Sequence, residues 1–131
     1  MRVLAVVVAA SAAAVSVAAC GGSGSGDSGS PGPVQHPKSL VGDVGHNDAF
    51  TISFKDENGD AIKNLAAGTY QLTIKDESSI HDFHLTGGGV DKATSVSGKG
   101  TTSFTVTFAP GKYSFLCDPH ASTMHGSFTV S

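Results

Sequence analysis

Alternation of hydrophobic and polar residues with a period of two is the feature of this chain that most restricts its fold. It recurs in five segments: "FTISF" (50–54), "YQLTI" (70–74), "FTVTF" (104–108), "YSFLC" (113–117) and "FTV" (128–130). Successive side chains of a β-strand point to opposite faces, so each segment predicts a strand with one apolar face. In the first segment, Phe50, Ile52 and Phe54 are expected to share that face. No stretch of ten or more residues has the spacing of an amphipathic helix.

Turn signals separate these segments and indicate how the strands connect. They are Asn58-Gly59 in "DENGDA", and then "AAGT", "LTGGGV" and "APGK". Short alternating strands at such intervals predict an all-β fold, an antiparallel sandwich or barrel. The segment "TTSFTVTFAPGKYSFLC" predicts a hairpin with a Pro-Gly turn. This hairpin would deliver Cys117 at a rim of the fold, with its side chain pointing inward.

The first twenty residues, "MRVLAVVVAASAAAVSVAAC", have the layout of a secretory signal: a positive start, an apolar middle and small residues before Cys20. A membrane-spanning helix is the alternative, but the run is a little short of the ~20 residues that a span needs. "VAAC" resembles the lipobox of bacterial lipoproteins. The resemblance implies a signal peptide over residues 1–19, a lipid on Cys20, and a protein anchored to the outer face of the bacterial cell membrane.

The remainder divides into a tether and one small domain. Residues 20–38 are rich in Gly, Ser and Pro and predict a flexible linker, and residues 39–131 are long enough for one core. The chain has 8 Lys plus Arg against 11 Asp plus Glu. No basic patch interrupts this mildly acidic balance, so nucleic acid is not an expected partner. We expect a monomer.

Three soft or borderline metal donors, Cys117, His120 and Met124, lie within eight positions in "FLCDPHASTMHG". If Cys20 carries lipid, Cys117 is the one free thiol of an exported protein, and an unpaired cysteine in an oxidising compartment needs a reason. A bound metal supplies one. A buried inert cysteine is the simpler alternative. A nucleophilic Cys117 with His120 as its base is disfavoured, because nothing here suggests the electropositive setting that activates a thiol.

A fourth donor is sought on another strand, and "SSIHDFHL" offers His81 and His84. His81, Phe83 and Leu85 alternate on an otherwise apolar face, whereas Asp82 and His84 fall on the opposite face. A histidine on the core-facing side can meet an inward-pointing Cys117. We therefore choose His81 as the metal ligand and expect His84 on the outer face.

"CDPHASTM", preceded by an aromatic-rich strand and matched with the upstream "HDFHL", resembles the type 1 copper site of the cupredoxin family, the plastocyanin-like and amicyanin-like small blue copper proteins. The resemblance implies a Greek-key β-sandwich and one copper ion, cycling between Cu(I) and Cu(II), held by His81, Cys117, His120 and Met124. It further implies a single-electron carrier with a redox protein partner, and not an enzyme. Two imidazoles, one thiolate and a weak axial thioether suit such a site independently, whereas zinc gains little from a thioether.

The sequence is also compatible with two other functions. A protein of the same fold could bind copper for storage, delivery or tolerance, or it could be an interaction module without metal. Two positions near the ligands bear on the site itself. Asp82 stands where the family usually has an Asn that ties the ligand segments together, and an ionised Asp can only accept hydrogen bonds. Pro119, two residues after Cys117, has no N–H to give to the sulfur. His36, His46 and His125 are expected at the surface.

Overall fold

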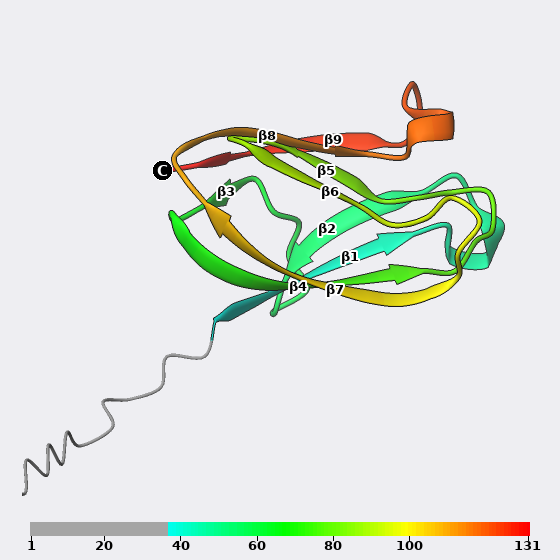
Figure 1. Cartoon of the computed structure of the whole chain (residues 1–131), viewed down its shortest axis with the longest axis horizontal. Helices are drawn as coiled ribbons and strands as arrows, with labels where there is room; N and C mark the ends of the chain where they lie inside the picture. The colour runs from blue at the N-terminus through cyan, green and yellow to red at the C-terminus, as the bar shows by residue number, and fades with distance from the viewer. Residues whose placement is uncertain (1–36) are drawn as a thin grey trace, which may run out of the picture. The chain divides into compact units, whose positions relative to one another are not determined.

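The computed structural model describes residues 37–131, which fold into a β-sandwich of two facing sheets (Figure 1). Two single-turn 3-10 helices interrupt the strands. In chain order the elements are β1 Lys38–Val44, η1 His46–Asp48, β2 Ile52–Asp56, β3 Asn64–Leu65, β4 Gly68–Asp76, β5 His84–Gly87, β6 Val90–Ala93, β7 Gly100–Phe108, β8 Gly111–Leu116, η2 Asp118–His120 and β9 His125–Val130. Among these elements no helix is long and apolar enough to cross a membrane.

One sheet has four strands in the order β2-β1-β4-β7, and the other has five in the order β3-β9-β8-β5-β6. The all-β sandwich agrees with the fold class expected from the sequence, but the strands are not all antiparallel. β1 pairs with β4 in parallel, and so does β3 with β9. Alternation along a strand is the same in both kinds of pairing, which is why the sequence did not reveal them.

The hairpin expected around Pro110-Gly111 is wrong. β7 belongs to the four-stranded sheet and β8 to the five-stranded sheet, so this connection crosses from one layer to the other. The Tyr113 hydroxyl fastens the crossing by donating to the carbonyl oxygen of Ala109 at 2.9 Å and accepting from its N–H at 3.1 Å. A hairpin and a crossover both need inward-facing residues on each strand, so the local pattern does not distinguish them.

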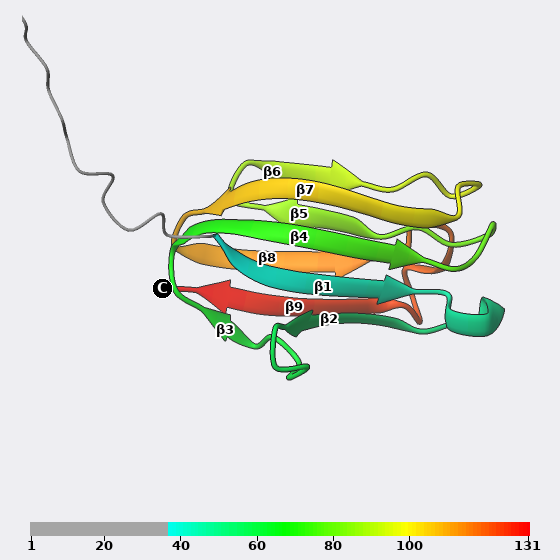
Figure 2. The same ribbon diagram turned by 90° about the horizontal axis from the view of Figure 1, so that it is seen from below.

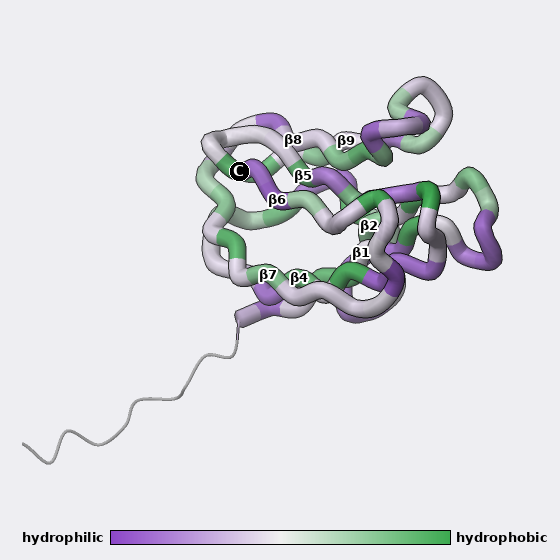
Figure 3. Tube along the Cα trace, turned by 45° about the vertical axis from the view of Figure 1, so that its right-hand side comes forward, coloured by the Kyte–Doolittle hydropathy of each residue, from purple (hydrophilic) through white to green (hydrophobic). Residues whose placement is uncertain are grey.

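The core lies between the sheets and follows the predicted alternation. Hydrophobic residues recur along the strands of both layers (Figure 3). Leu72, Ile74 and Tyr113 are fully buried, and the Phe83 and Phe115 rings stack with centroids 5.6 Å apart. Burial of side chains of this size contributes about 1.5–3 kcal/mol each before entropy is subtracted, so the packed core gives the loops at its edge a rigid base.

Three connections meet at one end of the sandwich, opposite the C-terminus (Figures 1 and 2). They are the β1–β2 connection with η1, the β4–β5 segment, and the loop between β8 and β9 that contains η2. We call this last stretch, residues 117–124, the ligand loop. The residues singled out in the sequence for metal binding lie in two of these three connections.

Candidate metal centre

Three potential metal donors from two connections converge at this end of the fold. His81 Nδ1 lies 3.0 Å from His120 Nδ1, and the Cys117 Sγ lies 3.6 Å from the first nitrogen and 3.5 Å from the second. Cys117 and His81 are completely buried, and His120 is half-buried. The structure thus brings together side chains that are 36 and 39 positions apart in the sequence.

The size of this triangle fits a metal ion. A point at its centre is about 2 Å from all three donor atoms, close to the ~2.0–2.3 Å of metal–nitrogen and metal–sulfur bonds. Both imidazoles present Nδ1 to that point. Since a nitrogen must be unprotonated to bind a metal, the proton of His81 belongs on Nε2, which is buried without a hydrogen-bond partner among residues 37–131.

Backbone hydrogen bonds shape the ligand loop. The Cys117 N–H donates to the Met124 carbonyl at 2.9 Å and closes the loop at its base. Within it, His120 donates to the Cys117 carbonyl at 3.0 Å, and Met124 donates to the His120 carbonyl at 2.8 Å. Met124 is fully buried, in line with a thioether that belongs to the site.

His81 precedes β5 instead of lying within a strand, and local side-chain bonds position the segment that carries it. The Ser78 N–H donates to the Asp76 carboxylate at 3.1 Å, and the Ile80 N–H donates to the Ser78 hydroxyl at 3.3 Å. Gly45 of the β1–β2 connection packs closely from the other side, with a φ of +67°. A Cβ at Gly45 would lie 2.9 Å from the His81 Cδ2, so only glycine allows this approach.

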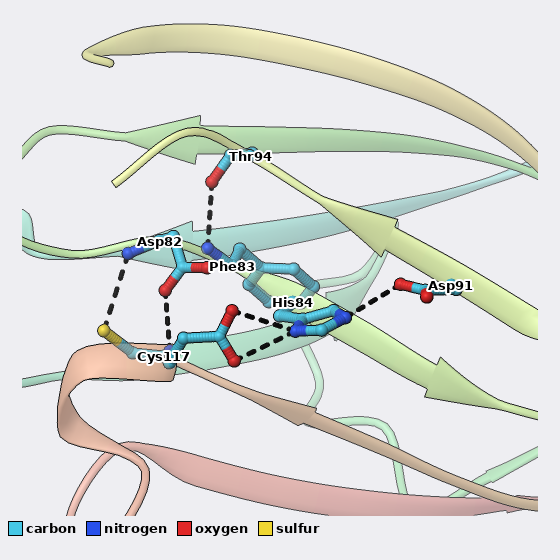
Figure 4. Close-up of polar contacts among 7 residues, drawn as sticks. Asp82, Phe83, His84, Asp91, Thr94 and Cys117 are labelled. Atoms are coloured by element: carbon cyan, nitrogen blue, oxygen red, sulfur yellow. Dashed lines mark hydrogen bonds and ion pairs between the residues drawn. The ribbon is translucent and has the colours of Figure 1, made fainter. Parts of the chain in front are cut away.

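Asp82, expected on the face opposite His81, links the two ligand-bearing segments and is only 1% exposed. Its N–H points to the Cys117 Sγ at 3.5 Å, and its Oδ1 accepts the Asp118 N–H at 2.7 Å (Figure 4). The carboxylate therefore forms the tie as an acceptor. Alternation placed Asp82 opposite the core correctly, but the ligand loop covers that side.

Burial raises the pKa values of two groups at this site. Desolvation raises the pKa of the Cys117 thiol, with the Asp82 and His120 backbone N–H groups acting in the other direction. Desolvation also raises the pKa of Asp82, while the hydrogen bond from Asp118 lowers it. In the absence of metal the thiol is therefore protonated at neutral pH, and a bound cation has to displace that proton.

Phe50 is the site residue that sequence reasoning missed. It was expected to share the face of Ile52 and Phe54, but it precedes β2 and is 57% exposed. Its ring meets both imidazoles edge to face, with centroids 5.0 Å from His81 and 4.7 Å from His120. The only signal in the sequence was an aromatic residue two positions before the strand, and alternation alone predicts such a residue to be part of the core.

The other described histidines lie outside the donor triangle. His84 bonds Asp91 and Asp118, exposed His46 pairs with Glu77 at 2.8 Å, and exposed His125 bonds the Ala121 carbonyl at 2.8 Å. His36 and the lipidation candidate Cys20 fall outside the described residues. Among residues 37–131, one cluster of three or more His, Cys, Asp or Glu donors could hold a metal: His81, Cys117 and His120.

This donor set discriminates between metals. Two histidines and one cysteine in a near-trigonal arrangement, with a weak axial methionine, form a type 1 copper site. Structural zinc takes four strong ligands and catalytic zinc keeps a position for water, and neither uses a buried thioether. His81, Cys117, His120 and Met124 therefore form one type 1 copper site.

Comparisons with known proteins agree with the fold and the site. Residues 37–131 match the family described as "Copper binding proteins, plastocyanin/azurin family". Reduced rusticyanin resembles the chain with a TM-score of 0.54 and 21% identity, over 71% of this chain and 78% of that one. Rusticyanin from Thiobacillus ferrooxidans gives 0.51 and 21%, over 71% and 76%. At this identity the likeness shows a shared fold. Comparison with curated protein sequences gave no significant match.

Proposed function

Because this chain belongs to the plastocyanin/azurin family of copper-binding proteins, we propose that it carries single electrons between redox protein partners. Membership of a family of electron carriers also means that the chain is not an enzyme. The observation that carries the proposal is the convergence of His81, Cys117 and His120, with two of the three fully buried. Copper bound there supplies a one-electron couple, Cu(II)/Cu(I).

The chain's own residues suit this task. Cys117, His81 and Met124 are shielded from water, and the hydrogen bonds of the ligand loop restrict the movement of Cys117 and Met124, which suits a site whose donors should move little on electron transfer. His120 alone among the four is partly exposed, which makes its ring edge the route for an electron to a partner. A site for copper storage or delivery would instead need access for an acceptor to the sulfur ligands.

We also propose that the protein works at the outer face of a bacterial cell membrane, tethered by lipid on Cys20. The lipobox-like "VAAC" and the Gly/Ser/Pro-rich linker support this placement. Cells expressing the full chain should yield membrane-bound protein with an acyl-modified Cys20 by mass spectrometry. A Cys20→Ala variant that stays equally membrane-bound would contradict the anchor.

Adding Cu(II) to the purified full chain tests the electron-carrier function. We expect a strong absorption in the red part of the visible spectrum with the narrow copper hyperfine splitting of a type 1 site in EPR, both bleached by a reductant and restored by an oxidant. Cys117→Ser should abolish the band, while His125→Gln, next to Met124 but outside the donor set, should keep it. A colourless protein would contradict the proposal, and rapid loss of copper to a chelator would favour copper handling instead.

A further inference from the structure

His84 is bonded on both sides by carboxylates. Its Nδ1 lies 3.0 Å from both carboxylate oxygens of Asp118, and its Nε2 lies 2.8 Å from the Asp91 Oδ1 (Figure 4). Asp91 belongs to β6 and Asp118 begins η2 in the ligand loop. The His84 side chain is 24% exposed, so water competes only partly for these bonds.

Both bonds require a charged ring. A neutral imidazole has one N–H and one lone pair, and a lone pair that faces a carboxylate is repelled. Only the imidazolium donates to Asp118 and Asp91 at once. In agreement with this geometry, the pKa of His84 is raised, first by the hydrogen bond to Asp118 and also by Asp91, against an opposing effect of burial.

The hydrogen bonds of His84 connect it to the copper site through Asp118. Asp118 follows Cys117 directly, and its N–H donates to Asp82, whose own N–H points to the Cys117 sulfur. His84 therefore holds the residue after the thiolate ligand against the β5–β6 hairpin. Loss of its proton removes one of the two bonds and one positive charge close to this loop.

We propose that His84 is a positioning residue of the copper site, whose imidazolium fixes Asp118 and makes the reduction potential follow the protonation of His84. This inference rests on the proposed electron-carrier function. Oxidation adds positive charge at the site, and a nearby cation opposes that addition. The potential should therefore fall as pH rises through the titration of His84.

The groups packed around His84 leave the two carboxylates as its charged partners. β8 presents Leu116 directly opposite, and His125 of β9 lies beyond Leu116 in the same row. β6 presents Ala93 opposite, with Lys92 next to it and Asp91 one diagonal step away. His125 bonds the Ala121 carbonyl and not His84, and Leu116 stands between the two histidines in this row.

Voltammetry of the copper-loaded full chain across pH tests the proposal, with the His84 titration followed by NMR on the reduced form. We expect an inflection of the midpoint potential at the NMR titration point of His84. It should vanish in His84→Gln and move to lower pH in Asp91→Asn, which removes one partner. His46→Gln, which removes an exposed histidine paired with Glu77, should leave it unchanged. An inflection that survives in His84→Gln, or a flat wild-type potential across the His84 titration, would overturn the proposal.

Hydrogen exchange of the Asp118 amide in the metal-free full chain separates this inference from the function itself. Failure to bind copper would end the electron-carrier function, but the amide still reports how firmly His84 holds the loop. We expect His84→Gln to speed its exchange about tenfold relative to His46→Gln, the effect of weakening a charge-assisted contact. Equal exchange in the two variants would overturn the role of His84 as a positioning residue.

Discussion

Asp82 and Asp118, each one position after a copper ligand, are joined by a hydrogen bond of 2.7 Å from the Asp118 N–H to the Asp82 Oδ1. This bond connects the segment that carries His81 to the loop that carries Cys117. The acid at this position therefore retains the accepting half of the tie that the family's asparagine makes, and the distance is that of a strong charge-assisted bond.

Removing the Asp82 side chain should loosen both ligand segments. Asp82→Ala leaves the Asp118 N–H without its partner, and we expect a loss of about 1–3 kcal/mol in the free energy of unfolding of the metal-free chain. Asp82→Asn keeps an acceptor and removes a buried charge, so it should be at least as stable as the wild type. Denaturant unfolding at neutral pH measures both. Equal destabilisation by Ala and Asn would show that the charge, and not the tie, matters.

Thr94 supports the strand that follows His81. Its Oγ1 accepts the Phe83 N–H at 2.9 Å (Figure 4), while its hydroxyl donates to the buried Asp76 at 3.2 Å. Thr94→Val should cost about 1–3 kcal/mol of unfolding free energy, because two polar groups lose their partner. Thr94→Ser retains the hydroxyl and should stay within about 1 kcal/mol of the wild type. Thermal unfolding of the two variants measures the difference, and equal stability of Thr94→Val and Thr94→Ser would contradict the role of the hydroxyl.

Phe50 covers the two imidazoles, so its removal should affect His120 before it affects the core. Phe50→Ala loses two edge-to-face contacts, and we expect about 1–2 kcal/mol less unfolding free energy together with greater solvent access to His120. Phe50→Leu keeps an apolar side chain over the imidazoles but lacks the ring, so its loss of unfolding free energy should lie between those of the wild type and Phe50→Ala. Denaturant unfolding and the reaction rate of the His120 ring with a histidine-modifying reagent are the measurements. An unchanged rate in Phe50→Ala would mean that the ring does not shield the ligand.

Copper affinity should depend on pH through the Cys117 thiol. Burial raises the pKa of this thiol above its ordinary value of 9.0, so at pH values of about 7 to 8 each bound ion displaces its proton. Copper affinity should therefore rise with pH, by about tenfold per pH unit from this proton alone. Calorimetry in buffers of different ionisation enthalpy counts the protons released. Release of less than one proton per copper would contradict a protonated thiol.

The sulfur of Cys117 has an N–H neighbour in Asp82, at 3.5 Å, while Pro119 offers none. Pro119→Ala supplies an N–H two residues after the cysteine. Hydrogen bonds to a copper thiolate weaken its donation to Cu(II), so the reduction potential should rise. Pro110→Ala, in the distant β7–β8 connection, should leave the potential unchanged. An unchanged or lower midpoint potential of Pro119→Ala in voltammetry would reject this expectation.

Alternation in the sequence was informative wherever one face of a strand meets the core. It separated His81 from His84, and in the structure His81 is fully buried with Phe83 and Leu85 while His84 lies on the other face. The same alternation correctly predicted that Tyr113, Phe115 and Cys117 are buried. These are positions at which a shift of one residue would expose an apolar side chain, so the pattern is strongly constrained.

The sequence was less informative where loops cover a face or where strands change layers. Asp82 is buried by the ligand loop, which arrives from more than thirty positions away, and no local pattern reports that cover. Phe50 is in register with Ile52 but stands before the strand begins, where the pleat no longer applies. The β7–β8 crossover likewise depends on which sheet each strand joins, and that choice is made by distant partners.

The bond between the Cys117 N–H and the Met124 carbonyl has a consequence for how such a centre can diversify. It closes the loop where β8 and β9 end their pairing. The pairing of the sheet therefore does not depend on how many residues the loop contains. Insertions or deletions there can retune the spacing of three ligands at little cost to the sandwich, whereas the fourth ligand, His81, is fixed by the packing of the scaffold itself.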